Sequence, residues 1–294
     1  MEITNLRAFM AIAETGSFSA AAERLYLSQP AISKRISILE TELGVRLFDR
    51  IGRGVQLTES GQTLHKRAHH LLQEVEDIRR DISSLTDTVS GKLVMATSHH
   101  IALHRLPLYL KQYMDSYPQV TLDLRFTDSE SGCRSVENGE LEFAVVTLPR
   151  KIVAPLEVIP LWEDELAIVV APDHPLNQNS MIRKTELLMH SAIMPERGTF
   201  TWEIVHDEFE IDESHVKIGL TSNYLETIKM LVSVGLGWSI LPKSMLVNSE
   251  LIALSVNNIQ LSRTLGIVYH RNKTLSNAAR HFIEMLRQTL TVYR

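Results

Sequence analysis

The stretch that decides the fold is Ser28-Gln29-Pro30-Ala31-Ile32-Ser33-Lys34-Arg35-Ile36-Ser37-Ile38-Leu39. It predicts a helix, because Ser28 is a good N-cap residue and Pro30 is tolerated in a first turn, where its missing N–H has no helical partner. Apolar side chains recur at steps of four, three and four from Ile32 to Leu43, and Gly44 follows as a stop signal. One face of this helix is therefore expected to pack in a core.

The other face of this helix is polar and nearly uncharged. Gln29 and Ser33 project from it, with Lys34 and Arg35 beside them. A glutamine amide can pair with adenine in the major groove, and basic side chains can reach guanine or phosphate. A solvated helix more often carries Glu and Lys, so the pattern favours a recognition helix that enters DNA. The alternative is a plain three-helix bundle in which these side chains are only solvated.

The segments around this helix complete a winged helix-turn-helix. A first amphipathic helix is expected at 6–13, and a second short helix follows with Ser19 as its N-cap. Downstream, short apolar segments flank the turn Gly52-Arg53-Gly54, which predicts a hairpin wing whose basic tip can lie along phosphates or in a minor groove. The residues expected to contact DNA are Ser28, Gln29, Pro30, Ser33, Lys34, Arg35, Arg50 and Arg53.

A long helix is expected after the wing, with Thr58 as its N-cap. Its apolar positions alternate at steps of four and three, as in the a and d positions of a heptad. So narrow a stripe favours a partner helix from a second copy over a globular core, and we therefore expect a homodimer. A two-fold dimer would read a palindromic DNA site with half-sites about 34 Å apart. The expected dimerisation residues are Leu64, Ala68, Leu71, Val75, Ile78, Ile82 and Leu85.

Composition limits the remaining function classes. The chain has 294 residues, 44% of them hydrophobic, which is enough apolar material for several packed domains. Its formal net charge is −5, so DNA binding must be confined to a local basic segment. The single cysteine, Cys133, excludes an internal disulfide and a cysteine-based zinc site within one chain, and a buried thiol is favoured over a redox sensor. No signal peptide or membrane-spanning stretch is recognised, so a cytoplasmic protein with no membrane partner is expected.

Many short motifs stand at fixed spacing along the N-terminal region. They are Thr15-Gly16-Ser17-Phe18, Ala21-Ala22, Leu25, Ser28-Gln29-Pro30-Ala31-Ile32-Ser33, Leu39-Glu40, Leu43-Gly44, Leu47-Phe48, Arg50, Leu57-Thr58 and Gly61. With them, the region closely resembles the LysR-type transcriptional regulators. Weaker matches continue to the C-terminus, through Gly91-Lys92-Leu93, Leu106-Pro107, His174-Pro175-Leu176, Val234-Gly235-Leu236-Gly237 and Leu241-Pro242. The resemblance implies binding to promoter DNA and a tetramer built as a dimer of dimers, with RNA polymerase as a further expected partner.

The C-terminal two-thirds alternates strand and helix patterns. A helix is expected at 106–117, a strand at 120–126 and a closing helix at 277–290. Two Rossmann-like α/β subdomains joined by two crossovers are expected, an arrangement that resembles the periplasmic solute-binding proteins. The predicted domains are a winged helix-turn-helix at 1–58, a linker helix at 59–89 and an effector-binding regulatory domain at 90–294, with subdomain I at about 91–161 and 267–294 and subdomain II at about 162–266.

Hydroxyl and amide side chains gather where the predicted strands end. In such sheets a ligand sits beyond the carboxyl ends of the strands, at helix N-termini. The residues expected to bind an effector are Thr97, Ser98, His99, His100, Thr127, Thr147, Thr221, Ser222 and Asn223, the last three as caps of a helix. Plain helix capping is the simpler interpretation of the same side chains. With the histidines nearby, they suit a small anion or a polar metabolite.

The stretch 96–100 is also similar to the cysteine-biosynthesis regulators of the family, which implies sulfur anions or acetylserine as effectors. No metal site is expected, because His99 and His100 are adjacent on what reads as an extended segment and would point in opposite directions. An enzyme is disfavoured, because neither a nucleophile elbow nor a glycine-rich phosphate loop occurs. A transport receptor fits the C-terminal fold but not the DNA-binding head. We therefore expect a ligand-responsive transcription regulator that needs no cofactor.

Overall fold

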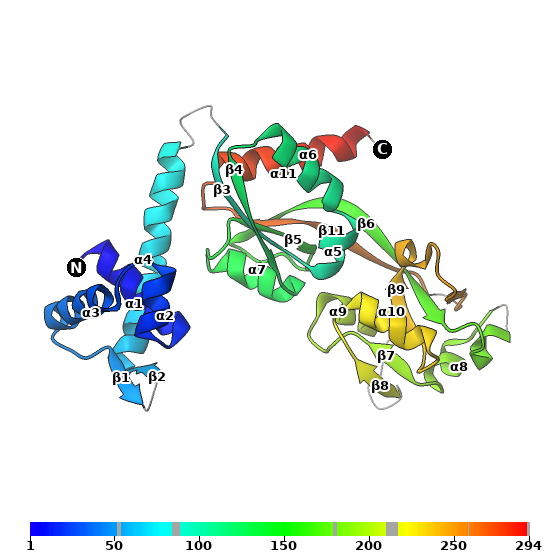
Figure 1. The fold of residues 1–294 in the computed structure, drawn as a ribbon. Helices are drawn as coiled ribbons and strands as arrows, with labels where there is room; N and C mark the ends of the chain where they lie inside the picture. Colours follow the sequence, from blue (N-terminus) through cyan, green and yellow to red (C-terminus); the bar gives the residue numbers. More distant parts are fainter. Residues whose placement is uncertain (52–53, 84–88, 179–180, 210–216, 258, 293–294) are drawn as a thin grey trace. The chain divides into compact units, whose positions relative to one another are not determined.

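The computed structural model describes residues 1–51, 54–83, 89–178, 181–209, 217–257 and 259–292. Two compact units are present, Met1–Leu85 and Thr86–Arg294 (Figure 1). Within the described residues, no helix combines the length and the apolar character that a membrane crossing requires.

The N-terminal unit packs three helices around one small core. They are α1 (Ile3–Thr15), α2 (Phe18–Arg24) and α3 (Gln29–Leu43). Ile32, Ile36 and Leu39 of α3 are buried in this core together with residues of α1, as the apolar stripe predicts. Both α1 and α3 end at a glycine with left-handed backbone, Gly16 and Gly44, so these two stop signals are confirmed.

Two local predictions in this unit are wrong. Leu43 does not extend the core stripe of α3, because residues 41–46 are all exposed and its side chain is 41% exposed. The N-cap of α2 is Ser17 rather than Ser19, since the Ser17 hydroxyl accepts a hydrogen bond from Ala20 N at 3.4 Å. The helix begins directly after the left-handed Gly16 has turned the chain, two residues earlier than its alanines indicate.

The wing and the long helix follow α3. The wing strands β1 (Phe48–Ile51) and β2 (Gly54–Leu57) pair antiparallel, with Phe48 opposite Leu57. The helix α4 (Glu59–Ser83) begins after Thr58, whose hydroxyl accepts from Gly61 N at 3.0 Å and donates to Arg46 O at 2.8 Å. A Cβ on Gly61 would lie only 2.2 Å from Leu47 O, just before β1, and 3.0 Å from Leu57 Cδ2 of β2, so glycine is what allows α4 to pass this close to the base of the wing.

The first half of the regulatory unit is a parallel α/β layer. Its strands β3 (Gly91–Thr97), β4 (Val120–Phe126) and β5 (Phe143–Thr147) pair parallel, and its helices are α5 (His99–His104), α6 (Pro107–Ser116), α7 (Ser129–Glu137) and α11 (Asn277–Val292). Tyr113 of α6 is fully buried against Phe282 of α11, and its hydroxyl donates to Ala278 O at 2.7 Å. This half corresponds to the predicted subdomain I.

Two long antiparallel strands connect this half to the next. They are β6 (Leu156–Val170) and β11 (Leu261–His270), which pair from Leu156 opposite His270 to Leu166 opposite Leu261. The register shifts between Leu265 and Gly266, where β6 contributes one extra residue. The full sheet order is β10-β6-β11-β5-β3-β4, with β9 also paired to β6. The two predicted crossovers are therefore the central parts of β6 and β11.

The second half of the regulatory unit is smaller and corresponds to the predicted subdomain II. Its elements are η1 (Pro175–Gln178), α8 (Lys184–Leu188), β7 (Ala192–Met194), α9 (Phe200–Phe209), β8 (Ile218–Thr221), α10 (Leu225–Ser233), β9 (Ser239–Pro242), η2 (Lys243–Leu246) and β10 (Ile252–Leu254). Trp238 and Phe209 are fully buried in its core, with ring centroids 5.9 Å apart. The two halves thus have separate cores and share one pair of strands.

Candidate DNA-binding surface and effector cleft

The polar face of α3 is open to solvent at its first turn. Ser28, Gln29 and Pro30 are exposed, and Gln29 Nε2 donates to Ser33 Oγ at 3.0 Å, which orients the glutamine amide along the helix surface. Lys34 is exposed and forms no ion pair with any residue that the structure describes. Ser28 occupies the N-cap position of α3, although its side chain makes no capping hydrogen bond. These side chains are therefore available to an outside partner.

The other basic candidates are in different situations. Arg35 is half-buried, and its guanidinium donates to Thr4 O at 3.4 Å, which ties it to the start of α1. Arg50 lies on β1 opposite Val55, but its side chain is outside what the structure describes. Arg53 lies outside the described residues. Arg35 therefore has a structural contact in addition to any role at DNA.

Sequence reasoning missed one exposed residue beside α3. Tyr26 lies in the turn between α2 and α3, is 95% exposed and has a left-handed backbone with φ of 55°. A non-glycine residue rarely adopts this conformation, which costs about 1 to 3 kcal/mol when it occurs. Its exposed hydroxyl is available to an outside partner such as DNA, but no local sequence pattern distinguishes it from an ordinary turn residue.

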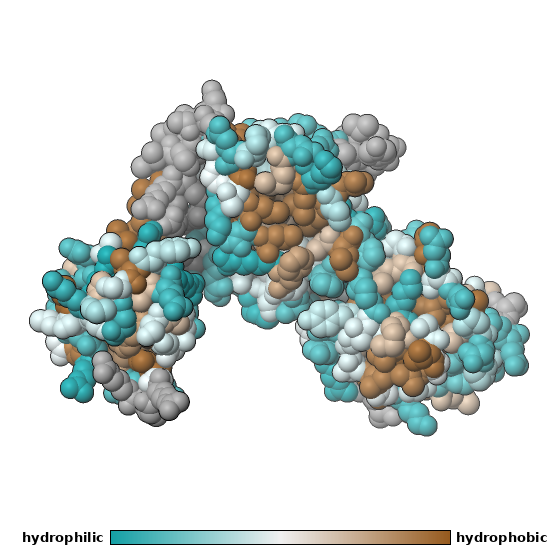
Figure 2. All heavy atoms as spheres, in the orientation of Figure 1, coloured by the Kyte–Doolittle hydropathy of each residue, from teal (hydrophilic) through white to brown (hydrophobic). Residues whose placement is uncertain are grey.

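The predicted dimerisation stripe on α4 divides into two parts. Leu64 is half-buried and Ala68 fully buried in the core of the N-terminal unit, so the chain itself accounts for these two positions. Leu71 and Ile78 are 47% and 50% exposed, and Val75 is half-buried. Figure 2 shows hydrophobic side chains along this part of α4. The stripe open to a partner therefore begins at Leu71, and its end falls on the Ile82 side chain and Leu85, which lie outside the described residues.

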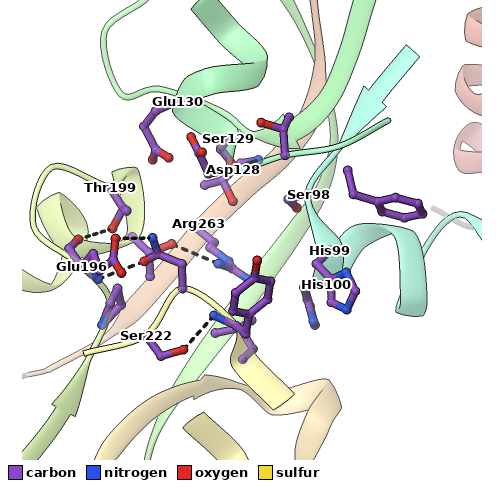
Figure 3. Close-up of a pocket in the computed structure, with 18 of the residues that line it drawn as sticks. Ser98, His99, His100, Asp128, Ser129, Glu130, Glu196, Thr199, Ser222 and Arg263 are labelled. Atoms are coloured by element: carbon purple, nitrogen blue, oxygen red, sulfur yellow. Dashed lines mark hydrogen bonds between the residues drawn. The ribbon is translucent and has the colours of Figure 1, made fainter. Parts of the chain in front are cut away.

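The regulatory unit contains a cleft between its two halves, with a volume of about 810 Å³ (Figure 3). Eight of the nine predicted effector-binding residues line it, namely Ser98, His99, His100, Thr127, Thr147, Thr221, Ser222 and Asn223. Thr97 does not, because it is fully buried at the end of β3 and its hydroxyl donates to Ser98 O at 3.3 Å. The carboxyl ends of β3, β4 and β5 thus meet the second half of the unit, as the topology predicts.

The predicted helix cap on this wall is wrong. The residue at the N-cap of α10 is Tyr224, and Ser222, two residues earlier, accepts a hydrogen bond from Tyr224 N through its Oγ at 3.2 Å. Asn223 instead spans the loop, since its Oδ1 accepts from Glu196 N and its Nδ2 donates to Glu196 Oε2, both at 3.0 Å. These side chains order the wall of the cleft rather than cap a helix.

Three carboxylates that the sequence did not single out also line the cleft. Asp128 caps α7 by accepting from Ser131 N at 2.6 Å, and Glu196 is the partner of Asn223. Glu130 of α7 accepts a hydrogen bond from Phe200 N at the start of α9, so it joins the two halves of the unit. Burial raises the pKa of Glu130. The lining is therefore more acidic than the expected hydroxyls alone indicate.

The cation of the cleft is Arg263 on β11, which is 7% exposed. Its NH1 donates to Thr201 Oγ1 at 3.0 Å, and its Nε and NH2 both lie 2.9 Å from Oδ2 of Asp164. Arg105 NH2 binds the other oxygen of Asp164 at 3.1 Å. Two guanidinium groups thus share one carboxylate, which leaves a net positive charge at the floor of the cleft.

The histidines lie on a helix rather than on an extended segment. His99 and His100 open α5, and His99 packs edge-on against Phe126 and Tyr224. His100 is 5% exposed, and burial together with the charge of Arg263 lowers its pKa to about 4. The premise behind the predicted absence of a metal site is therefore wrong, since a helix places His100 on the same face as His104.

The lone thiol is buried behind the cleft. Cys133 on α7 is 6% exposed, and desolvation together with the negative charge of Glu130 raises its pKa to about 12. The interpretation of Cys133 as a buried thiol is confirmed.

Comparisons with known proteins agree with both units. Residues 3–62 match the family described as bacterial regulatory helix-turn-helix protein, lysR family, and residues 86–291 match the LysR substrate binding domain. A probable RuBisCO transcriptional regulator of Trichormus variabilis is 31% identical over 95% of this chain and 86% of its own length. Its counterpart in Synechocystis is 32% identical over 98% of this chain and 87% of its own length.

Solved structures give the same architecture. Full-length OxyR from Pseudomonas aeruginosa covers 99% of this chain and 95% of its own, with a TM-score of 0.69 and 24% identity. CbnR bound to its target DNA covers 98% of this chain and all of its own, with a TM-score of 0.69 and 21% identity. The solved structures show the fold of the chain, and the two family matches show that it consists of two domains. The chain therefore belongs to the LysR family of transcriptional regulators, a non-enzymatic family that combines a DNA-binding helix-turn-helix with an effector-binding domain.

Proposed function

We propose that this chain controls transcription at a promoter near its own gene, and that a small polar metabolite in the cleft of the regulatory unit sets its activity. The observation that carries the proposal is the exposed first turn of α3, with Gln29 oriented by Ser33 and Lys34 available to an outside partner. A protein of this kind acts in the cytoplasm, beside the DNA and RNA polymerase, and the function requires no cofactor.

The test is binding of the full chain to its own upstream region, measured by fluorescence anisotropy at several salt concentrations. Lys34→Ala should weaken binding to every sequence and reduce the slope of log K against log salt by about 1, because one phosphate contact is lost. Gln29→Ala should instead reduce the discrimination between specific and random DNA by about 1 to 3 kcal/mol. Lys111→Ala, at a 73% exposed lysine of the regulatory unit, is the matched control. Unchanged binding by both α3 variants would contradict the proposal.

Assembly as a homodimer is proposed through α4. Leu71, Val75 and Ile78 form the part of its stripe that the core of the N-terminal unit leaves open. Two copies would present two α3 helices to a palindromic site. Sedimentation should show a dimer or a dimer of dimers, and Leu71→Glu should shift it towards monomer. Leu43→Glu is the control, since Leu43 is a similarly exposed leucine outside the stripe, at 41% against 47%.

The effector is proposed to be a polar metabolite with hydrogen-bond donors, rather than a bare inorganic anion. Asp128, Glu130 and Glu196 face the same cleft as Arg263, and a sulfate-like dianion would gain from the arginine but be repelled by the three carboxylates. Amino or hydroxyl groups on the ligand would satisfy these oxygens. Among the effectors of the cysteine-biosynthesis branch, this favours acetylserine over sulfate and thiosulfate.

Calorimetry on the full chain distinguishes these ligands. O-acetylserine and other amino or polyhydroxy metabolites should be compared with sulfate and thiosulfate at constant ionic strength. Glu196→Gln should alter the binding of a donor-rich ligand, because it removes a charge while keeping the geometry of the Asn223 contact. Tight binding of sulfate or thiosulfate, unaffected by this substitution, would overturn the proposed ligand class.

A further inference from the structure

A cluster of side chains of types that can ligate a metal lies beside the cleft, where the two halves of the regulatory unit meet. His100 and His104 are one turn apart on α5, with ring centroids 4.8 Å apart. Glu226 faces them from α10 of the other half, and its Oε1 is 2.9 Å from His104 Nε2. One ligand atom from each of the three residues lies within 4.8 Å of the others.

Several atoms of this cluster are buried without a protein partner. Neither ring nitrogen of His100 has a hydrogen-bond partner among the described protein atoms, although the side chain is 95% removed from solvent. The second carboxylate oxygen of Glu226, Oε2, is buried and has no such partner either. Unsatisfied buried polar atoms cost about 1 to 3 kcal/mol each, so three of them in one place indicate that a further group is bound beside them.

The carboxylate of Asp164 does not satisfy His100. Asp164 Oδ2 is 3.9 Å from His100 Nε2, which is beyond hydrogen-bond length, and both oxygens of Asp164 already bind Arg105 and Arg263. A hydrogen bond from His100 to this carboxylate would therefore have to displace an arginine. The unsatisfied nitrogens of His100 are not explained by the ion-pair network beside them.

We propose that His100, His104 and Glu226 bind a divalent transition-metal cation of the zinc class. Two imidazoles and one carboxylate are a donor set that Zn²⁺ and its neighbours accept, with one further position for water. A tetrahedral ion with bonds of 2.0 to 2.1 Å holds its ligand atoms about 3.3 Å apart. The widest separation in the cluster would have to close by roughly 1.5 Å to reach that value, through rotation of the His104 and Glu226 side chains, which are 42% and 37% exposed.

Such an ion would act as a clasp between the halves of the unit. Its imidazoles come from α5 in subdomain I and its carboxylate from α10 in subdomain II, and His100 itself lines the cleft. Binding would favour the arrangement in which the two walls lie this close together. The metal would therefore favour a closed cleft, the same cleft in which the proposed effector binds, without touching DNA.

Metal binding is tested on the full chain, purified without a polyhistidine tag and freed of metal with a chelator. Zn²⁺ is titrated by calorimetry, and Co²⁺ by visible absorption, which reports tetrahedral coordination. One site per chain is expected, and His104→Gln and Glu226→Gln should each weaken it at least about tenfold. His100→Gln is the variant at the third proposed ligand. If it fails to fold, Glu226→Gln still tests the site, because the Glu226 side chain is 37% exposed.

The matched control is the other histidine pair of the regulatory unit. His174 and His190 have ring centroids 5.0 Å apart, and the described residues give them no third ligand in the manner of Glu226. His190→Gln should leave the site unchanged. If the wild-type protein binds no Zn²⁺, or if His104→Gln and Glu226→Gln retain full affinity, water satisfies the cluster and the proposal is overturned. The measurement needs neither promoter nor effector, so its failure is separate from failure of the proposed function.

Discussion

Arg263 and Asp164 are direct cross-strand partners at the place where β11 and β6 pass between the two halves of the regulatory unit. Both side chains are almost fully buried, at 7% and 2% exposure, and two guanidinium nitrogens lie 2.9 Å from one carboxylate oxygen. The floor of the cleft and the connection between its walls therefore depend on the same ion pair.

Removal of this arginine should destabilise the protein strongly. Arg263→Ala leaves the buried Asp164 carboxylate with Arg105 as the one arginine that the described residues pair with it, and breaking a buried pair in this way costs about 3 kcal/mol or more. Urea unfolding measures the loss. Lys243→Ala is the control. It breaks an exposed ion pair with Glu165, the neighbour of Asp164 on β6, and should lower the free energy of unfolding by less than about 1 kcal/mol. Equal losses in the two variants would contradict the role assigned to burial.

Cys133 should be unreactive in the folded protein at neutral pH. Its pKa of about 12 leaves the thiolate a rare species, so alkylation of the native thiol should be slower than in the unfolded chain by on the order of a thousandfold. A thiol-labelling time course with and without denaturant checks this, and rapid native labelling would contradict it. Peroxide treatment should accordingly leave DNA binding unchanged.

The raised pKa of Cys133 also makes the free energy of unfolding depend on pH. Its contribution is fully present below the unfolded pKa near 8.5 and is lost as pH rises towards about 12.

Tyr26 is predicted to lower stability while it strengthens DNA binding. Tyr26→Gly removes the strain of its left-handed backbone and loses little packing, because the side chain is 95% exposed, so stability should rise by up to about 1 kcal/mol. Affinity for DNA should fall several-fold, since tyrosine hydroxyls contact phosphates. Urea unfolding and anisotropy are measured on the same preparation. Tyr26→Asn, which also tolerates this backbone, separates the two effects, and a variant that binds DNA as well as the wild type would rule out the contact.

Gly61 should resist the smallest substitution. In Gly61→Ala the new methyl carbon would meet Leu47 O at 2.2 Å, so α4 and the wing must move apart, at a cost of about 1 to 3 kcal/mol. Ser60→Ala, one residue earlier in α4, is the control and should change stability little. Thermal unfolding of the two variants gives the comparison. A Gly61→Ala protein as stable as the control would show that the helix end shifts without cost.

The strongly periodic segments were predictable from the sequence. The stripe of α3 from Ile32 to Leu39, its glycine stop and the strand Val120–Phe126 are found as predicted, because each depends on local patterning of apolar side chains. The first part of β6 was not predicted, since Glu157, Glu163 and Glu165 interrupt its apolar pattern. These glutamates lie on a strand that is paired along its length but open to solvent over part of it.

The residues that line the cleft were predictable only in part, because some of them are placed by contacts far away along the chain. Hydroxyl residues at strand ends are placed by topology, and eight of nine line the cleft. Arg263 and Glu130 line it through tertiary contacts with Asp164 and Phe200, which are far away along the chain and leave no local trace. The partnership of His104 with Glu226 likewise joins residues that only the fold brings together.

The pairing of β6 with β11 limits how the regulatory unit can respond to anything bound in its cleft. Ten residues of β11 are matched to β6 in one antiparallel ladder, so sliding one half along the other would break the ladder throughout. A two-stranded ribbon resists shear but twists and flexes readily. Next to Leu265 the strand β11 is also paired to β5, so the described ribbon consists of β6 and β11 alone around Arg263 and Asp164. Opening and closing should therefore be a rotation about that stretch, so that binding of a small ligand is converted into an angular displacement of one half against the other.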